Sequence, residues 1–124
     1  MLKWNPHEII ECLEVLPEVG EDETSYVFQV ARDGLRLELA IFQYEADVRI
    51  RIYRDGSEQP IFHAQIISCP LVRYVAEKNG VECLEISGLF GYRIGDEDKV
   101  LVPVLVRVTV NPQIEVELRI PPAA

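Results

Sequence analysis

Apolar and polar residues alternate on both sides of Asp33-Gly34, a dipeptide that is typical of two-residue hairpin turns. When the chain is folded about this pair, one face of the ladder is apolar and the other carries polar residues such as Gln29 and Glu38. The apolar rungs are Val30 with Leu37, Phe28 with Leu39, and Tyr26 with Ile41. Because the turn residues and the hydrophobic pattern agree on one register, the sequence predicts an antiparallel hairpin with one buried side.

Further strands are predicted along the rest of the chain. They cover residues 48–52, 61–68, 81–87, 99–110 and 114–120, and the fourth strand is expected to stop at Cys69-Pro70. Residues 71–80 fit either a short helix or a strand, because Asn79-Gly80 can end a helix or form a hairpin turn. In the hairpin register Glu77 would face Glu82, a like-charge pair that slightly favours the helix.

Two segments of the second half are less regular. Pro103 has no N–H group, so it is expected at a sheet edge or a bulge. Residues 88–95 are predicted to form a glycine-punctuated loop or an irregular strand, and an acidic turn is predicted at 96–98.

A short helix is predicted over residues 6–16. Asn5 is expected to cap its start, with Pro6 at the first helical position, where the missing N–H group does no harm. Ile9, Ile10, Leu13 and Leu16 fall on one face at helical spacing, and Glu8, Glu11 and Glu14 fall on the opposite side. Pro17 ends the helix, and an acidic loop follows over residues 18–23.

These elements together predict a mainly β protein of the α+β class. Six to seven short strands, separated by turn residues, indicate an antiparallel β-sandwich or a strongly curled sheet with the short N-terminal helix packed on one face or edge. A parallel sheet would need crossover helices, which the pattern does not offer. The length of 124 residues and the lack of a linker indicate a single domain, 1–124.

Negative charge is concentrated near the N-terminus. The net charge is −9, and seven carboxylates stand between Lys3 and Arg32 with no Lys or Arg among them. They are Glu8, Glu11, Glu14, Glu18, Glu21, Asp22 and Glu23. Such a field repels phosphate backbones and anionic membrane surfaces, so we expect no nucleic acid and no membrane partner. It favours a basic protein as the partner.

The chain has no sequence signal for a membrane span or for secretion. Its longest apolar run, residues 100–106, is far shorter than the roughly 20 residues that cross a bilayer. The first eight residues lack the positive charge and apolar core of a signal peptide, so we expect a cytoplasmic protein.

No constellation of residues in the sequence predicts catalysis, a cofactor or a metal site. The three cysteines, Cys12, Cys69 and Cys83, are an odd number without C-x-x-C spacing, so reduced and buried thiols are expected. Asp96-Glu97-Asp98 lacks the further oxygen donors of a calcium loop. The glycines at 88, 91 and 95 fit no nucleotide-binding motif.

The leading hypothesis is a non-enzymatic protein-binding module, such as an inhibitor, an immunity factor or an assembly adaptor. Its acidic N-terminal segment would engage a basic protein partner. The expected partner-binding residues are Trp4, Glu8, Glu11, Glu14, Glu21, Asp22 and Glu23.

Two alternatives remain open at this point. One is a small-molecule-binding or enzymatic β domain with a pocket near Cys69, His63, Phe90 and Tyr92, in which a thiol at a helix start would be the reactive group. The other is a structural subunit of a homo-oligomer, for example a homodimer formed through an exposed edge of the strand at 100–110.

Overall fold

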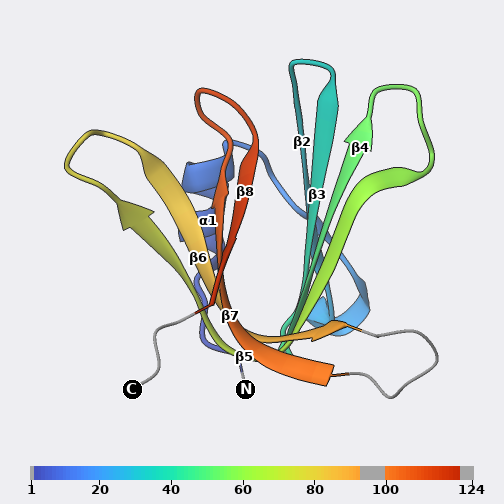
Figure 1. Ribbon diagram of the computed structural model, residues 1–124, viewed down its shortest axis with the longest axis vertical. Helices are drawn as coiled ribbons and strands as arrows, with labels where there is room; N and C mark the ends of the chain where they lie inside the picture. The colour runs from blue at the N-terminus through green and yellow to red at the C-terminus, as the bar shows by residue number, and fades with distance from the viewer. Residues whose placement is uncertain (1, 93–99, 121–124) are drawn as a thin grey trace.

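The computed structural model describes residues 2–92 and 100–120, which fold into one curled antiparallel sheet with a short helix (Figure 1). The elements are α1 (Pro6–Leu13), β1 (Glu18–Val19), a 3-10 turn (Glu21–Glu23), β2 (Tyr26–Arg32), β3 (Leu35–Phe42), β4 (Asp47–Arg54), β5 (Pro60–Ala76), β6 (Glu82–Tyr92), β7 (Val100–Thr109) and β8 (Glu115–Arg119).

Each strand pairs with the strand before and after it in the sequence, so the order across the sheet is β1 to β8. The sheet is curled and not closed, which confirms the curled alternative of the predicted fold class. The described residues form eight strands instead of six to seven, because Glu18–Val19, predicted as part of an acidic loop, forms a two-residue strand against β2. In the described part of the chain, no helix is long and apolar enough to cross a bilayer.

The hairpin about Asp33-Gly34 has the predicted register. Arg32 pairs with Leu35 next to the turn, and the ladder continues to the pair of Tyr26 with Ile41. Asp33 and Gly34 both have positive φ, 51° and 78°, as a type I′ turn requires. The hydrophobic pattern therefore decided which face of this hairpin is buried.

The helix begins as predicted and ends earlier. The side chain of Asn5 accepts a hydrogen bond of 2.9 Å from the backbone N–H of His7, which caps the helix start. Glu14 adopts a left-handed conformation (φ 59°), and its N–H donates to the carbonyl of Ile10, so the helix stops at Leu13. Leu16, expected on the apolar face, is consequently 80% exposed.

Residues 71–76 form a strand, which settles the ambiguity in favour of the hairpin. Residues 77–81 connect β5 to β6, and the N–H of Glu77 bonds the carbonyl of Val81, so the loop beyond this hydrogen bond has three residues rather than two. Ala76 therefore pairs with Glu82, and the expected like-charge rung between Glu77 and Glu82 does not form. A three-residue loop with a glycine at its end is a common hairpin connection.

β5 does not stop at Cys69-Pro70 but bends there and continues. The register against β6 shifts between Ile67 and Leu71, and Ser68 has a positive φ of 50°. The 17-residue strand is shared by two wings of the sheet, one formed by β2, β3 and β4 and the other by β6, β7 and β8 (Figure 1). A bulge of this kind bends the strand and increases its twist, which lets one sheet enclose a core.

Gly88 lies opposite this bend. The predicted loop at 88–95 belongs to β6 as far as Tyr92, and its remainder lies outside the described residues, as does the predicted turn at 96–98. A Cβ atom on Gly88 would lie 2.4 Å from Cγ2 of Ile66 and 2.8 Å from the carbonyl oxygen of Ile67. Only glycine lets β5 and β6 approach this closely at the bend.

The inner face of the curl and α1 share one hydrophobic core. The helix contributes Ile9, Cys12 and Leu13, all at most 1% exposed. Among the fully buried strand residues are Phe28, Leu37, Leu39, Ile41, Ile50, Ile66, Leu84 and Ile86. Pro103 lies in the half of β7 that β8 does not reach, since β8 pairs only with Leu105–Thr109, and its predicted edge position is confirmed.

Candidate partner-binding surfaces

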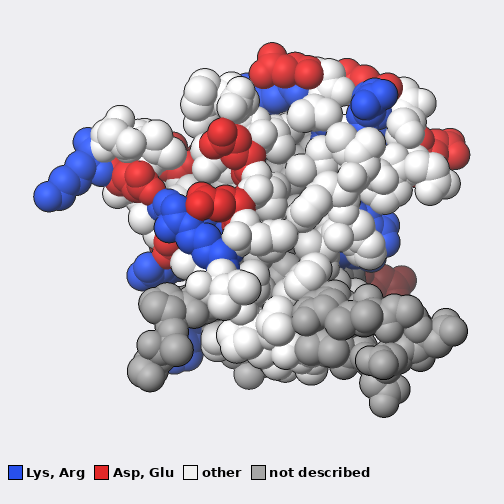
Figure 2. Space-filling model, in the orientation of Figure 1, with Lys and Arg blue, Asp and Glu red and all other residues white. Residues whose placement is uncertain are grey.

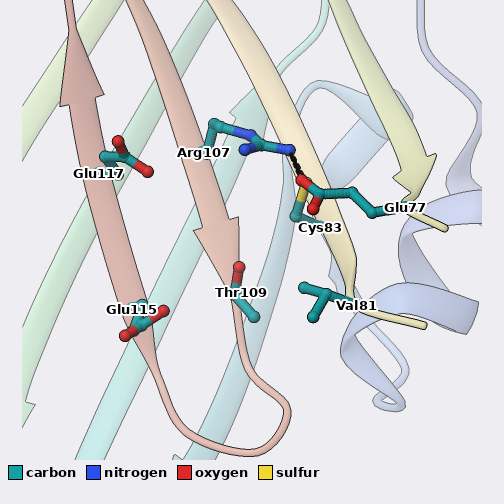
Figure 3. A pocket seen from close by; sticks show the side chains of 7 residues that line it. All are labelled: Glu77, Val81, Cys83, Arg107, Thr109, Glu115 and Glu117. Atoms are coloured by element: carbon teal, nitrogen blue, oxygen red, sulfur yellow. Dashed lines mark hydrogen bonds and ion pairs between the residues drawn. The ribbon is translucent and has the colours of Figure 1, made fainter. Parts of the chain in front are cut away.

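A polar pocket of about 150 Å³ lies on the outer face of the wing that contains β6, β7 and β8 (Figure 3). Its lining residues come from the β5–β6 connection and from three strands: Glu77, Val81, Cys83, Arg107, Thr109, Glu115 and Glu117. Three carboxylates therefore face one guanidinium group. A cavity with this surplus of negative charge favours a cationic group.

Arg107 is held at the centre of this pocket by its neighbours. Its Nη2 donates to Glu77 and lies 3.3 Å from the sulfur of Cys83, and its Nε lies 3.4 Å from Oε2 of Glu85. The hydrogen bond to Glu77 raises the pKa of Arg107. Glu85 also accepts a hydrogen bond of 2.8 Å from Nε of Arg73. Arg107 thus pairs with Glu77 and Glu85 of its own chain, while its buried Nε has no hydrogen-bond partner among the described residues.

The two acids of β8 on the other side of the pocket are less neutralised. Glu117 accepts a hydrogen bond of 2.6 Å from Nε of Arg119, which lowers the pKa of Glu117. Glu115 accepts a hydrogen bond from the neutral amide of Gln113 and has no ion pair among the described residues. Both side chains are exposed.

The acids of α1 lie at the same end of the sheet. The helix packs against β5 and β6, and Figure 1 shows it beside β6, near the tips of the β5–β6 and β7–β8 hairpins. Glu11 lies close enough to Tyr74 of β5 to help raise its pKa, although the main cause is the hydrogen bond that the Tyr74 hydroxyl donates to Glu82. Figure 2 shows acidic side chains over these hairpins, with basic side chains directly beside them.

We call this group of carboxylates the acidic rim. It comprises Glu8 and Glu11 of the helix, Glu14 directly after the helix, Glu77 and Glu82 of the β5–β6 hairpin, and Glu115 and Glu117 of β8. Of the first three acids, only Glu14 has an ion pair within the described chain, 3.3 Å from Arg32. Arg32 therefore neutralises one of the three, and Glu8 and Glu11 keep their charge.

The remaining predicted residues form a separate area. The segment Glu18–Glu23 lies beside the foot of the β2–β3 wing, away from α1 (Figure 1). The Trp4 ring packs edge-on against Tyr26 at 4.7 Å, and its Nε1 donates to the side chain of Gln43 at 3.2 Å. Gln43 in turn donates to the backbone carbonyl of Glu23 at 2.6 Å. The structure thus joins Trp4 to the 3-10 turn.

Sequence reasoning missed several of these groups. Gln43, which links Trp4 to the acidic turn, was part of a polar interruption between strands, and nothing local marked its partners. Arg107 is the first charged residue after the apolar run from Val100, and Glu115 and Glu117 alternate with apolar residues in the last strand. The charge of these residues is visible in the sequence. That they line one pocket could not be predicted, because it depends on the pairing of distant strands.

Cys69 and His63, expected near one pocket, lie on opposite faces of the sheet. Cys69 is completely buried in the core, and burial raises the pKa of its thiol to about 11, so it is not an activated nucleophile. His63 is exposed on the outer face and pairs with Arg51 of β4. Residues 71–76 are a strand, so the expected helix start beside Cys69 is absent. The side chain of Tyr92 is outside the described part.

Phe90 lines a different cavity, an apolar groove of about 310 Å³ at the mouth of the curl. Val102, Val104, Leu118, Arg119 and Ile120 complete its lining. Within residues 2–92 and 100–120, no group of three or more His, Cys, Asp or Glu side chains is placed to hold a metal ion.

Comparison with known proteins gives one likeness of fold. No protein-family model and no curated protein matches the chain. One chain of a solved complex, described as a contact-dependent growth inhibition toxin and immunity protein complex from Klebsiella pneumoniae 342, is similar with a TM-score of 0.74. The match covers 95% of both chains at 15% sequence identity. At this identity the likeness shows a shared fold.

Proposed function

We propose that this chain is a protein-binding module of the immunity type, which engages a basic protein partner through the acidic rim. The observation that carries the proposal is the grouping of acids on one wing: acids of the β5–β6 hairpin and of β8 line a pocket with one arginine, and α1 packs against β5 and β6 of the same wing. The similar fold in a toxin and immunity protein complex supports a protein as the partner.

The immunity role is favoured over the toxin role by the state of the reactive groups. Burial raises the pKa of Cys12 to about 12 and that of Cys69 to about 11, so both thiols are protonated at neutral pH. His63 lies on the opposite side of the sheet from these thiols. All three cysteines are free, which suits the cytoplasm as the compartment of the proposal.

Charge of this kind acts mainly on the rate of association. Complementary fields raise association rates and are screened over about 8 Å at physiological salt. We assign the main role to Glu8, Glu11 and Glu14 because α1 packs against β5 and β6 and only one of these three acids has an ion pair within the described chain. Glu21, Asp22, Glu23 and Trp4 form a second contact area in this proposal, on the side of β1.

Affinity capture followed by a growth assay tests the proposed function. The tagged full-length chain and a Glu8→Gln/Glu11→Gln/Glu14→Gln variant are used at two salt concentrations, and proteins retained only by the unchanged chain are identified. The captured protein is expected to be basic, to arrest bacterial growth when expressed alone, and to be harmless when this chain is expressed with it. A captured partner that is acidic, or whose expression leaves growth unaffected in both cases, would remove the proposal.

A homodimer is a second candidate, which one observation favours. Residues 101–104 of β7 pair with β6 on one side and, within the described part of the chain, have no partner strand on the other, and Val102 and Val104 line the apolar groove. Leu118 and Ile120 next to that groove are 43% and 79% exposed. Light scattering after size exclusion distinguishes a monomer from a dimer, and a monomer at millimolar concentration excludes this candidate.

A further inference from the structure

Three arginines lie side by side on the outer face of the other wing, in an otherwise acidic protein. Arg49 and Arg51 alternate along β4, and Arg36 lies on the neighbouring strand β3 opposite Tyr53. Cross-strand partners share one face of a sheet, so all three side chains lie on the solvent side. Arg51 also pairs with His63 of β5. We call Arg36, Arg49 and Arg51 the arginine row.

The arginine row is only partly neutralised. Within the described residues its single ion pair joins Arg49 to Glu38, with 3.4 Å between Nη2 and Oε1. The Nε atoms of Arg36, Arg49 and Arg51 are buried and have no hydrogen-bond partner in the described chain. Arg32 and Arg107 also have a buried Nε without a hydrogen-bond partner among the described residues, so what distinguishes the row is one ion pair for three neighbouring guanidinium groups.

Aromatic rings hold two members of the row in place. The guanidinium carbon of Arg36 lies 4.4 Å from the ring centroid of Tyr53, and that of Arg49 lies 5.4 Å from the ring centroid of Phe42. Stacking of this kind fixes the plane of a guanidinium group and leaves its edge free for carboxylates. Less side-chain entropy is then lost when a ligand binds.

The positive charge of the row affects the pKa of His63. Partial burial lowers the pKa of this imidazole from its ordinary value, and the charges of Arg51 and Arg49 lower it further. Its neighbour Gln65 on β5, which pairs with Arg49, is uncharged. The only acid on the central rungs of this face is Glu38, which pairs with Arg51 across the strands. The centre of the face is thus positive.

We propose that the arginine row is a second docking surface, which binds an extended, carboxylate-rich segment of a protein. Arg49 and Arg51 are two residues apart on one strand, roughly 7 Å, and alternate carboxylates of an extended segment have the same spacing. Each can receive a bidentate arginine contact. A nucleic acid is disfavoured as the occupant, because the net charge of −9 repels a long phosphate chain. This inference stands apart from the proposed function, since it concerns another face and the opposite charge.

Nuclear magnetic resonance with a synthetic peptide tests this surface. The probe is a blocked octapeptide of alternating Glu and Thr, added to the full-length protein while the arginine Nε–H signals and the titration of His63 are followed. Saturable shifts are expected at Arg36, Arg49 and Arg51, together with a rise in the pKa of His63 as carboxylates offset the arginine charges. Arg49→Gln/Arg51→Gln is expected to weaken binding by about fivefold, as loss of two exposed charge pairs implies.

A matched control removes the same charge elsewhere. The variant Arg73→Gln/Arg119→Gln changes two arginines of the other wing and loses the same two positive charges. Its affinity for the peptide should stay within about twofold of that of the unchanged protein, because salt screens charges at this distance. Equal weakening by both double variants would show general attraction and overturn the proposal, as would the absence of saturable shifts. If an oligothymidylate of equal charge binds more tightly than the peptide, the assignment to carboxylates is wrong. Should the Arg49→Gln/Arg51→Gln protein fail to fold, the two single variants carry the same test.

Discussion

Replacing Gly88 by alanine is expected to destabilise the protein through a collision at the bend of β5. The added Cβ would lie 2.4 Å from Cγ2 of Ile66 and 2.8 Å from the carbonyl oxygen of Ile67. The Ile66 methyl group can shift with a change of its side-chain torsion angle, but the carbonyl oxygen belongs to the backbone of a paired strand. The two strands must therefore move apart where the sheet turns.

Two opposing contributions set the change in the free energy of unfolding. Overpacking of a well-filled site costs about 1–3 kcal/mol, and the upper part of that range applies because a backbone atom is involved. Removal of a glycine from a strand returns about 0.5–1 kcal/mol through the unfolded state. We expect a net loss of about 2 kcal/mol in the free energy of unfolding, which lowers Tm by about 8 °C for a chain of this size.

Urea unfolding followed by circular dichroism measures this loss. Ser87→Ala is the matched control, because it changes the neighbouring residue on the opposite face and is expected to stay within about 0.5 kcal/mol of the unchanged protein. A Gly88→Ala protein that is as stable as the unchanged one, or more stable, would refute the close approach of β5 and β6 and with it the account of the bend.

Three further predictions concern single groups. The thiols of Cys12 and Cys69 should react with iodoacetamide at pH 8 at least about a hundredfold more slowly than in the unfolded chain, because their raised pKa values, about 12 and about 11, leave little thiolate; mass spectrometry counts the adducts, and labelling at the unfolded rate would contradict their burial. Asn5→Ala should destabilise the protein by about 1 kcal/mol in urea unfolding through loss of the helix cap, and an unchanged midpoint would show that the cap is dispensable. Glu82→Gln should lower the pKa of Tyr74 from about 12 toward 10, so that its phenolate appears at lower pH in an absorbance titration; an unchanged curve would mean that Glu82 does not hold the hydroxyl proton.

Elements specified by neighbouring residues were predictable from the sequence. The register of the β2–β3 hairpin followed from Asp33-Gly34 and the alternation around it, and the helix start followed from Asn5 and Pro6. Both signals are local, since a turn and a cap involve residues a few positions apart.

Features that depend on distant residues were not predictable. Cys69-Pro70 looked like a stop, but β5 passes through it because Gly88, on another strand, makes room for the bend. The helix end was misplaced because nothing in the apolar spacing signalled the left-handed Glu14. Within the candidate surface, the helix acids were identified from their charge, whereas Arg107 and its pocket required four segments to meet.

The most direct test of the central claim is the association rate between this chain and its captured partner, measured by stopped flow over a range of salt concentrations. Glu8→Gln/Glu11→Gln/Glu14→Gln is compared with Glu45→Gln/Asp55→Asn/Glu58→Gln, which removes three exposed acids away from the rim. The account predicts that the rim variant associates about five- to tenfold more slowly at low salt, that the difference disappears at high salt, and that the control changes little. Equal rates for the unchanged protein and the rim variant would contradict it.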